Sequence, residues 1–193
     1  TPFYRYHQDH GASFVDFAGW EMPIRYGSII EEHHAVRESL GIFDVSHMGR
    51  IRFSGRHARR MLERLCTRRL SDMQPRQCRY SFVCNATGGV MDDVIVYRYD
   101  DHWMMVCNAS NREKLLAHFE AVQGDLSVKI DDQTEATGMI ALQGPNAMDF
   151  IAKFSSEVPS LKPFTFAVKN LLIVKMTISR TGYTGEDGVE IIM

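Results

Sequence analysis

The sequence predicts an α+β protein built largely from antiparallel sheets with helices packed against them. Three short strands are expected at 79–84, 90–99 and 103–108, and the connections between them are only a few residues long. Connections of that length join antiparallel neighbours. Two Ser-x-x-Glu capping boxes, at 28–31 and 110–113, each precede apolar residues at helical spacing, which predicts helices between the sheet segments.

Composition limits the class of protein. A chain of 193 residues with 45% hydrophobic side chains can bury the core of one or two domains. The net charge of −2 is too small to direct the whole chain toward nucleic acid or membrane, and no apolar run approaches the roughly 20 residues that span a bilayer. The four cysteines contain no Cys-x-x-Cys pair, which indicates reduced thiols and neither a disulfide framework nor a zinc site.

The first fifty residues are expected to hold one strand and one helix. The strand lies at 14–17 and is ended by Gly19 and Pro23. His7 and His10 are expected on the surface, because no further metal ligand lies near them in the sequence. The helix begins at Ser28 and is ended by Gly41, and residues 43–49 follow as a loop. The inner face of this helix is expected to carry Ile29, His33, Val36 and Leu40.

A second helix is expected at 56–66, with Ala58, Met61, Leu62 and Leu65 facing inward. Six arginines lie within fourteen residues on its outer face and exit: Arg56, Arg59, Arg60, Arg64, Arg68 and Arg69. A solvated basic face is the ordinary interpretation, and a docking surface for an acidic partner is the functional one. Nucleic acid is less favoured as the partner, because no aromatic side chains interleave for base stacking.

The rest of the chain is expected to alternate strands and helices. One helix follows Ser110, with Leu115, Phe119 and Val122 on one face. Another starts near Pro145, and its expected inner residues are Ala147, Phe150, Ile151 and Phe154. Strands are expected at 128–134, 138–143, 172–179 and 189–193. The chain stops within the last of these strands, which indicates the N-terminal part of a longer protein.

Two adjacent acids lie in the strand that follows the glycine turn at 85–89. Side chains alternate along a strand, so Asp93 shares a face with Met91, Ile95 and Tyr97, and Asp92 lies on the other face. An unpaired carboxylate among apolar neighbours costs about several kcal/mol, so each acid needs a partner or a role. We interpret Asp93 as the functional acid and Asp92 as a cap of the turn. Two solvated acids at a strand entrance are the alternative.

Standard catalytic signatures are absent from the sequence. It contains no P-loop, no Gly-x-Gly-x-x-Gly after a strand, no His-Glu-x-x-His and no Gly-x-Ser-x-Gly. The remaining candidates are Asp93, Asn108, Tyr183 and Glu190. Acids, an amide and an aromatic ring suit an uncharged or cationic heteroaromatic ligand that donates hydrogen bonds, and they do not suit phosphate.

Five motifs, in order along the whole chain, carry a family resemblance. They are Val-Asp-Phe-Ala-Gly-Trp-Glu-Met-Pro (15–23), Phe-Asp-Val-Ser-His-Met-Gly (43–49), Gly-Gly-Val-Met-Asp-Asp-Val-Ile-Val (88–96), Leu-Gln-Gly-Pro (142–145) and Gly-Tyr-Thr-Gly-Glu-Asp-Gly-Val-Glu (182–190). Together they resemble the N-terminal portion of the aminomethyltransferase of the glycine cleavage system, the T-protein family. The resemblance implies a folate-binding, aminomethyltransferase-like fold. A discontinuous first domain (1–49 and 136–193) would wrap an inserted α+β domain (50–135).

The resemblance also implies roles for single residues. Asp93 matches the family's essential carboxylate, and the implied pterin-binding positions are Met48, Asn108, Phe164, Tyr183 and Glu190. Tetrahydrofolate would act as co-substrate without a metal, and a lipoylated H-protein would be the partner, through Arg56, Arg60 and Arg64. In the implied reaction an aminomethyl group leaves the lipoyl arm, ammonia is released, and 5,10-methylenetetrahydrofolate forms. The implied location is the cytoplasm of a bacterium, or the mitochondrial matrix of a eukaryote; no nucleic acid or membrane is involved.

Other functions remain open on the same fold. One is a non-catalytic folate-binding protein, and another is a different folate-dependent demethylase. Members of the non-catalytic group carry a cysteine-bearing loop where this chain has Gly-Tyr-Thr-Gly-Glu-Asp-Gly, and they need not keep the second acid of the Asp-Asp pair. Both features favour the enzyme. A further possibility is that the chain of 193 residues is inactive by itself.

Overall fold

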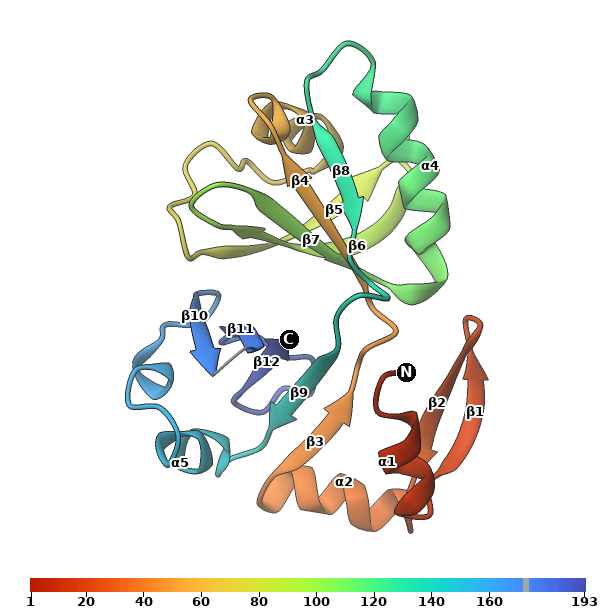
Figure 1. Ribbon diagram of the computed structural model, residues 1–193, viewed down its shortest axis with the longest axis vertical. Coiled ribbons are helices and arrows are strands. Elements are labelled where there is room, and N and C mark those ends of the chain that lie inside the picture. The colour runs from red at the N-terminus through yellow and green to blue at the C-terminus, as the bar shows by residue number, and fades with distance from the viewer. Residues whose placement is uncertain (172–173) are drawn as a thin grey trace. The chain divides into compact units, whose positions relative to one another are not determined.

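The computed structural model describes all residues except 172 and 173, and it divides the chain into two compact units (Figure 1). The discontinuous unit consists of Thr1–His47 and Thr137–Met193, and the inserted unit is Met48–Ala136. The boundaries expected from the sequence, at 49/50 and 135/136, lie two residues and one residue from those of the structure. No described helix is long and apolar enough to serve as a bilayer-spanning segment.

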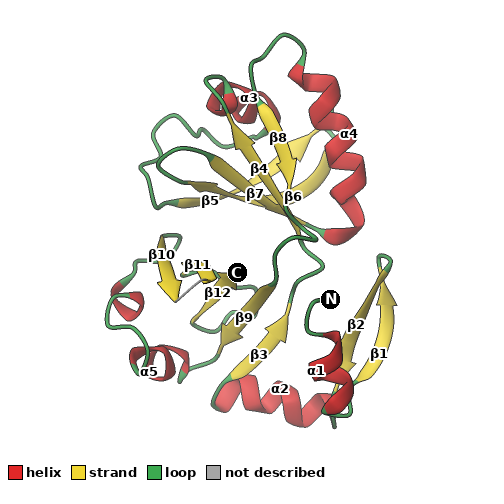
Figure 2. Ribbon diagram, in the orientation of Figure 1, coloured by secondary structure: helices red, strands yellow, loops and turns green. Residues whose placement is uncertain are grey.

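The inserted unit is a five-stranded antiparallel sheet with its helices packed on it (Figure 2). The strand order is β5-β6-β7-β4-β8. The predicted three-strand meander is confirmed, because β5 pairs with β6 and β6 with β7, both antiparallel. The elements are β4 (Gly49–Ser54), α3 (Ala58–Leu65), β5 (Cys78–Cys84), β6 (Val90–Arg98), β7 (Trp103–Cys107), η1 (Ala109–Asn111), α4 (Arg112–Gln123) and β8 (Lys129–Asp132).

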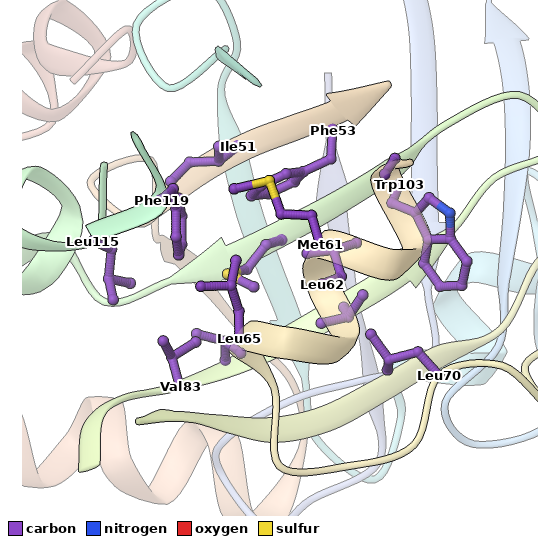
Figure 3. Close-up of a cluster of buried hydrophobic side chains, with 14 of the residues drawn as sticks. Ile51, Phe53, Met61, Leu62, Leu65, Leu70, Val83, Trp103, Leu115 and Phe119 are labelled. Carbon is purple, nitrogen blue, oxygen red and sulfur yellow. The ribbon is translucent and has the colours of Figure 1, made fainter. Parts of the chain in front are cut away.

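The core of the inserted unit joins both helices to the sheet. Side chains of α3, α4 and β4 point toward one another in Figure 3. The predicted inner residues of α3 are all buried, and so are Leu115 and Phe119 of α4. Val94 and Val96 of β6 belong to the same cluster. The face of β6 that carries these two valines therefore packs into the core.

The discontinuous unit holds a second five-stranded antiparallel sheet, ordered β10-β11-β12-β9-β3, and a separate hairpin. Of the strand predicted at 172–179, residues 174–179 form β11 and the first two lie outside the described residues. The elements are α1 (Tyr4–Asp9), β1 (Ser13–Phe17), β2 (Trp20–Arg25), α2 (Ile29–Glu38), β3 (Gly41–Asp44), β9 (Met139–Gln143), α5 (Ala147–Ala152), η2 (Val158–Ser160), β10 (Phe166–Leu171), β11 (Val174–Ser179) and β12 (Gly188–Ile192).

Two predictions for the N-terminal segment are wrong. Pro23 does not end a strand but lies inside β2, opposite Phe14. A two-stranded hairpin has two outer edges, where a residue without an N–H group costs no ladder hydrogen bond. His7 is buried: its Nε2 lies 2.8 Å from Oδ2 of Asp44 and its Nδ1 lies 2.5 Å from the hydroxyl of Tyr26. These two partners satisfy the ring, so burial carries no uncompensated polar cost.

Helix α2 begins as predicted, with the hydroxyl of Ser28 accepting the N–H of Glu31. It ends at Glu38, earlier than predicted, and Gly41 is the first residue of β3. A Cβ on Gly41 would lie 2.4 Å from Cγ2 of Val36, so this glycine allows the strand to approach the helix. The predicted loop at 43–49 therefore starts as strand. The predicted inner face is wrong at Ile29 and His33, which are exposed, because α2 packs on β3 mainly through Val36.

Two helix predictions in the second half also need correction. The capping box at 110–113 does not form, because η1 precedes α4 and the N-cap is Asn111, without a side-chain cap. In α5, Ala147 and Ile151 are buried as predicted, but Phe150 and Phe154 are 37% and 78% exposed. The helix ends at Ala152, so Phe154 lies past the last turn and cannot follow its inner face.

Candidate functional site

Asp93 lies on a half-exposed aromatic part of the inserted sheet. Its carboxylate accepts hydrogen bonds from Nδ2 of Asn108 at 2.9 Å and from the hydroxyl of Tyr80 at 3.2 Å. Phe82 is its cross-strand neighbour on β5. Tyr80 and Phe82 are each 39% exposed, and their rings lie edge to face at 5.5 Å between centroids. A carboxylate with spare acceptor capacity thus stands beside two exposed rings.

Asp92 lies on the core side of the same strand and is only 4% exposed. Its Oδ2 accepts the backbone N–H of Asn108 at 2.9 Å, and its Oδ1 accepts Nδ2 of Asn108 at 2.9 Å and Nδ2 of Asn111 at 2.6 Å. The predicted capping of the glycine turn is therefore wrong. The turn is capped by Asn85, whose Oδ1 accepts the N–H groups of Thr87 and Gly89.

The face of β6 that carries Asp93 is only partly accessible. Met91, Asp93 and Ile95 are half-buried, but Tyr97 is fully buried. The accessible part of this face is thus limited to the first half of the strand. Met48, at the start of the inserted unit, is half-buried, and its carbonyl accepts a hydrogen bond from Nη1 of Arg50 at 2.6 Å. Arg50 itself is fully buried and also donates to the carbonyl of Thr134.

Glu190 lies on β12 of the discontinuous unit. It accepts a hydrogen bond from the hydroxyl of Thr181, which is itself 2.8 Å from the hydroxyl of Ser179. Burial raises the pKa of the Glu190 carboxyl above its ordinary value, and the hydrogen bond from Thr181 opposes that shift. Among the described residues no cation pairs with Glu190, so this acid keeps acceptor capacity and a preference for its proton.

Tyr183 stands at the tip of the glycine-rich loop that joins β11 to β12, and it is 94% exposed. The loop is fastened on both sides of this residue. Arg37 donates to the carbonyl of Thr184 at 2.7 Å and to Glu186 at 2.8 Å, and Arg180 pairs with Asp187. The ring of Tyr183 is therefore held away from the body of its unit by anchored neighbours.

Gln143, at the end of β9, forms hydrogen bonds that anchor the same loop. Its buried Nε2 donates to the carbonyls of Thr181 and Val189, each at 3.2 Å, and its Oε1 accepts the hydroxyl of Thr184 at 3.1 Å. A Cβ on Gly182 would lie 1.9 Å from Oε1 of Gln143. The Leu-Gln-Gly-Pro and Gly-Tyr-Thr-Gly motifs thus fit together as one local structure.

Phe164 is a non-glycine residue in the left-handed region, with φ of 59°, and its ring is about half exposed. Its N–H donates to the carbonyl of Arg180 at 3.0 Å. A bulky residue in this region is uncommon and is often found at functional positions. Of the predicted binding residues, Met48 and Asn108 belong to the inserted unit with Asp93, and Phe164, Tyr183 and Glu190 belong to the discontinuous unit.

The predicted arginine surface is present on the inserted unit. Its six members are all exposed: Arg56, Arg59, Arg60, Arg64, Arg68 and Arg69. Helix α3 begins at Ala58, so Arg56 precedes it. Arg69 lies 3.4 Å from Asp72, and within the described part of the chain the other five have no carboxylate partner. This surface therefore concentrates uncompensated positive charge.

Sequence reasoning missed Tyr80 and Gln143 as site residues. Tyr80 lies in the neighbouring strand, and only the register that sets Phe82 opposite Asp93 brings its hydroxyl within reach. Gln143 lies inside a quoted motif, and a glutamine in an otherwise apolar strand was the available signal. No cluster of three or more potential metal ligands occurs in the part of the chain that the structure describes.

Comparison with known families identifies the class of this chain. The model of the GCVT N-terminal domain matches residues 3–193. The chain therefore belongs to the GCVT N-terminal domain family, and the predicted family resemblance is confirmed.

Similar proteins carry the name aminomethyltransferase. That of Rubrobacter xylanophilus is 46% identical over 194 residues, and one from Desulfitobacterium hafniense is 41% identical over 195 residues. Each alignment covers 100% of this chain, and the shares of the relatives that it covers are 52% and 53%. The chain thus spans about half the length of the curated relatives it matches.

Solved structures confirm the predicted fold class. The glycine cleavage system aminomethyltransferase T from Bartonella henselae matches with a TM-score of 0.90 at 32% identity, over 100% of this chain and 53% of that one. A heterotetrameric sarcosine oxidase from Corynebacterium sp. U-96 matches with a TM-score of 0.58 at 13% identity, over 85% of this chain and 82% of that one. The second likeness concerns the fold alone.

Replacing Glu190 with Gln should change how stability depends on pH. Because the folded pKa of Glu190 is raised, the folded state binds this proton more tightly than the unfolded state, and stability falls as pH rises through the folded pKa. Glu190→Gln has no such proton, so its stability relative to the native protein should increase over that range. Urea unfolding from pH 4 to pH 8, with the exposed Glu120→Gln as control, measures this. A constant difference between Glu190→Gln and the native protein across that range would contradict it.

Proposed function

We propose that the protein is a tetrahydrofolate-dependent aminomethyltransferase of glycine cleavage. It would take the aminomethyl group from the lipoyl arm of an H-protein, release ammonia and form 5,10-methylenetetrahydrofolate. The observation that carries the proposal is the half-buried carboxylate of Asp93, held by Asn108 and Tyr80, in a chain of the GCVT N-terminal domain family. The proposed location is the bacterial cytoplasm, or the mitochondrial matrix if the source is eukaryotic.

The proposed chemistry suits a carboxylate and needs no metal. The transferred carbon forms bonds to N5 and N10 of folate, and its bonds to the ammonia nitrogen and the lipoyl sulfur break. The two protons lost from folate nitrogens leave on ammonia and on the lipoyl thiol. Positive charge develops at the amine as these bonds exchange, and a fixed carboxylate stabilises that charge without reorganising. Asp93 is the proposed catalytic acid.

The proposed folate contacts lie on each unit separately. On the inserted unit, Asn108 and Met48 accompany Asp93, and the exposed rings of Tyr80 and Phe82 offer a flat apolar surface. On the discontinuous unit, the proposed folate-binding domain, the contacts are Phe164, Tyr183 and Glu190. Rings that stack, with acceptors for N–H donors, match the chemistry of a pterin.

Tetrahydrofolate should bind saturably to the full-length protein. Tyr183→Ala should weaken this binding about tenfold, because an exposed ring held by an anchored loop loses its stacking surface. Isothermal titration calorimetry measures the dissociation constants of the native protein and of Tyr183→Ala. The matched control is Tyr6→Ala, another exposed tyrosine of the same unit, which should leave the constant unchanged. Absence of saturable heat with the native protein would exclude the proposed function.

Asp93→Asn should lower kcat by about a hundredfold to a thousandfold, the range for loss of one preorganised electrostatic contact. Its shape is kept and its site is half-exposed, so the melting temperature should change little. Steady-state kinetics with the carrier and a thermal melt separate these effects. Asp125→Asn, at an exposed loop position, serves as the control. A kcat within about twofold of the native value would remove Asp93 from the mechanism.

The arginine surface is the proposed docking site for the H-protein, through Arg56, Arg60 and Arg64. Arg60 and Arg64 lie four residues apart on α3, so they present charge in one direction, and Arg56 adds charge just before the helix. Exposed charges attract an acidic carrier mainly by guiding its diffusional approach, which raises the association rate. Salt weakens this attraction, because charges are screened beyond a Debye length of about 10 Å at 0.1 M ionic strength.

Reversing Arg60 and Arg64 to Glu together should raise KM for the carrier and reduce its dependence on salt, while kcat stays nearly constant. The charge-matched control reverses Arg5 and Lys162, both exposed on the discontinuous unit. Initial rates at several carrier and salt concentrations decide the matter. Equal KM values for the two double variants would place the carrier elsewhere.

A further inference from the structure

We propose that Asp92 is a positioning residue for the ligand site. It fixes the side-chain amide of Asn108 so that Oδ1 of Asn108 faces outward as an acceptor for an N–H group of the folate ring. This inference rests on the proposed function for its ligand, but the geometry that carries it concerns the inserted unit alone. It replaces the turn-capping role predicted from the sequence.

The contact between Asp92 and Asn108 is made twice. The backbone N–H of Asn108 binds Oδ2 of Asp92 and its side-chain NH2 binds Oδ1, both at 2.9 Å. The residue that follows β7 is thus held by main chain and side chain together. Such a double contact defines both the position of Asn108 and the direction of its amide.

The two acids leave the amide of Asn108 one orientation. Its NH2 group also donates to Oδ1 of Asp93 at 2.9 Å and to the carbonyl of Asp93 at 3.3 Å. Ionised carboxylates and carbonyls accept hydrogen bonds and cannot donate them. Rotating the amide by half a turn would place its oxygen against these acceptors, with loss of each hydrogen bond and added repulsion.

The carbonyl oxygen of Asn108 is consequently left for a ligand. Throughout the described chain no donor contacts this Oδ1. Its neighbour Asp93 is half-buried and keeps acceptor capacity beside its two donors. Two acceptors, one on β6 and one directly after β7, then stand together, which fits a ring with N–H donors and disfavours one with acceptors alone.

Asp92 also has an ordinary structural role, and the two roles can be separated. Its third hydrogen bond, from Nδ2 of Asn111 at 2.6 Å, anchors the start of α4 without touching Asn108. Asn111→Ala removes only that bond. Asp92→Asn places an NH2 group against the donors of Asn108 and permits its amide to rotate. Both variants should lower the melting temperature, but only the second should disturb the ligand site.

The test is a set of tetrahydrofolate dissociation constants by calorimetry. Asp92→Asn should raise the constant about tenfold, and Asn111→Ala should change it less than about twofold. Asn108→Ala should raise it about as much as Asp92→Asn, and the double variant Asp92→Asn with Asn108→Ala should equal Asn108→Ala alone. Additive losses, or equal effects of Asp92→Asn and Asn111→Ala, would overturn the inference and leave Asp92 as a structural residue.

A measurement on the native protein keeps the test independent of variant folding. With 15N-labelled asparagine, the side-chain NH2 protons of Asn108 should exchange with solvent on the order of tenfold more slowly than those of the exposed Asn85. Equal exchange rates would overturn the fixed orientation. Failure of the native protein to bind tetrahydrofolate would instead overturn the proposed function and the ligand of this inference with it.

Discussion

A buried carboxylate needs hydrogen-bond donors, and Asp92, which has no cation partner in the described part of the chain, imposes that requirement on the inserted unit. Its donors come from Asn108 and Asn111, which lie between β7 and α4. If either oxygen of Asp92 lost its donors, part of a buried charge would be left uncompensated, at a cost on the order of a few kcal/mol. The chain leaving β7 is therefore tied to β6, and Asn108 is brought to Asp93. The arrangement of the candidate site follows from satisfying its buried neighbour.

In the discontinuous unit, a neutral side chain, that of Gln143, forms the buried hydrogen bonds that hold the candidate loop. Gln143 is fully buried in β9, and its amide satisfies main-chain carbonyls at both ends of the loop between β11 and β12. The close approach excludes a side chain at Gly182 and at Gly188, where a Cβ would lie 2.6 Å from Nε2 of Gln143. Conformational freedom lost in the loop is offset by these bonds and by the pairs of Arg37 and Arg180. An anchored loop can then expose Tyr183 without leaving it disordered.

The sequence predicted what depends on short-range pattern. Alternation along β6 separated Asp92 from Asp93, and helical spacing identified the buried residues of α3. The failures occur where a distant partner decides. Asn111 is recruited by Asp92, nineteen positions away, so the capping box at Ser110 is displaced. His7 is buried because both nitrogens of its ring form hydrogen bonds, with Asp44 and with Tyr26. The hydroxyl of Tyr80 reaches Asp93 only because of the register between β5 and β6. Pattern gives the face of a side chain, but tertiary pairing decides its partner.

Three acids of this chain differ in how many hydrogen-bond donors the protein supplies to each carboxylate. That difference distinguishes an acid with a structural role from acids with acceptor capacity for a ligand. Asp92 has three amide donors and is buried, so it has little left to offer a ligand. Asp93 has two donors and stands half-exposed beside aromatic rings. Glu190 has one hydroxyl donor in a site whose burial raises its pKa, so donor groups brought by a ligand would favour its ionised form. A carboxylate binds a ligand through the acceptor capacity that the fold leaves unused. This difference supports the proposal that Asp93 and Glu190 face a ligand, and that Asp92 acts through the amide of Asn108.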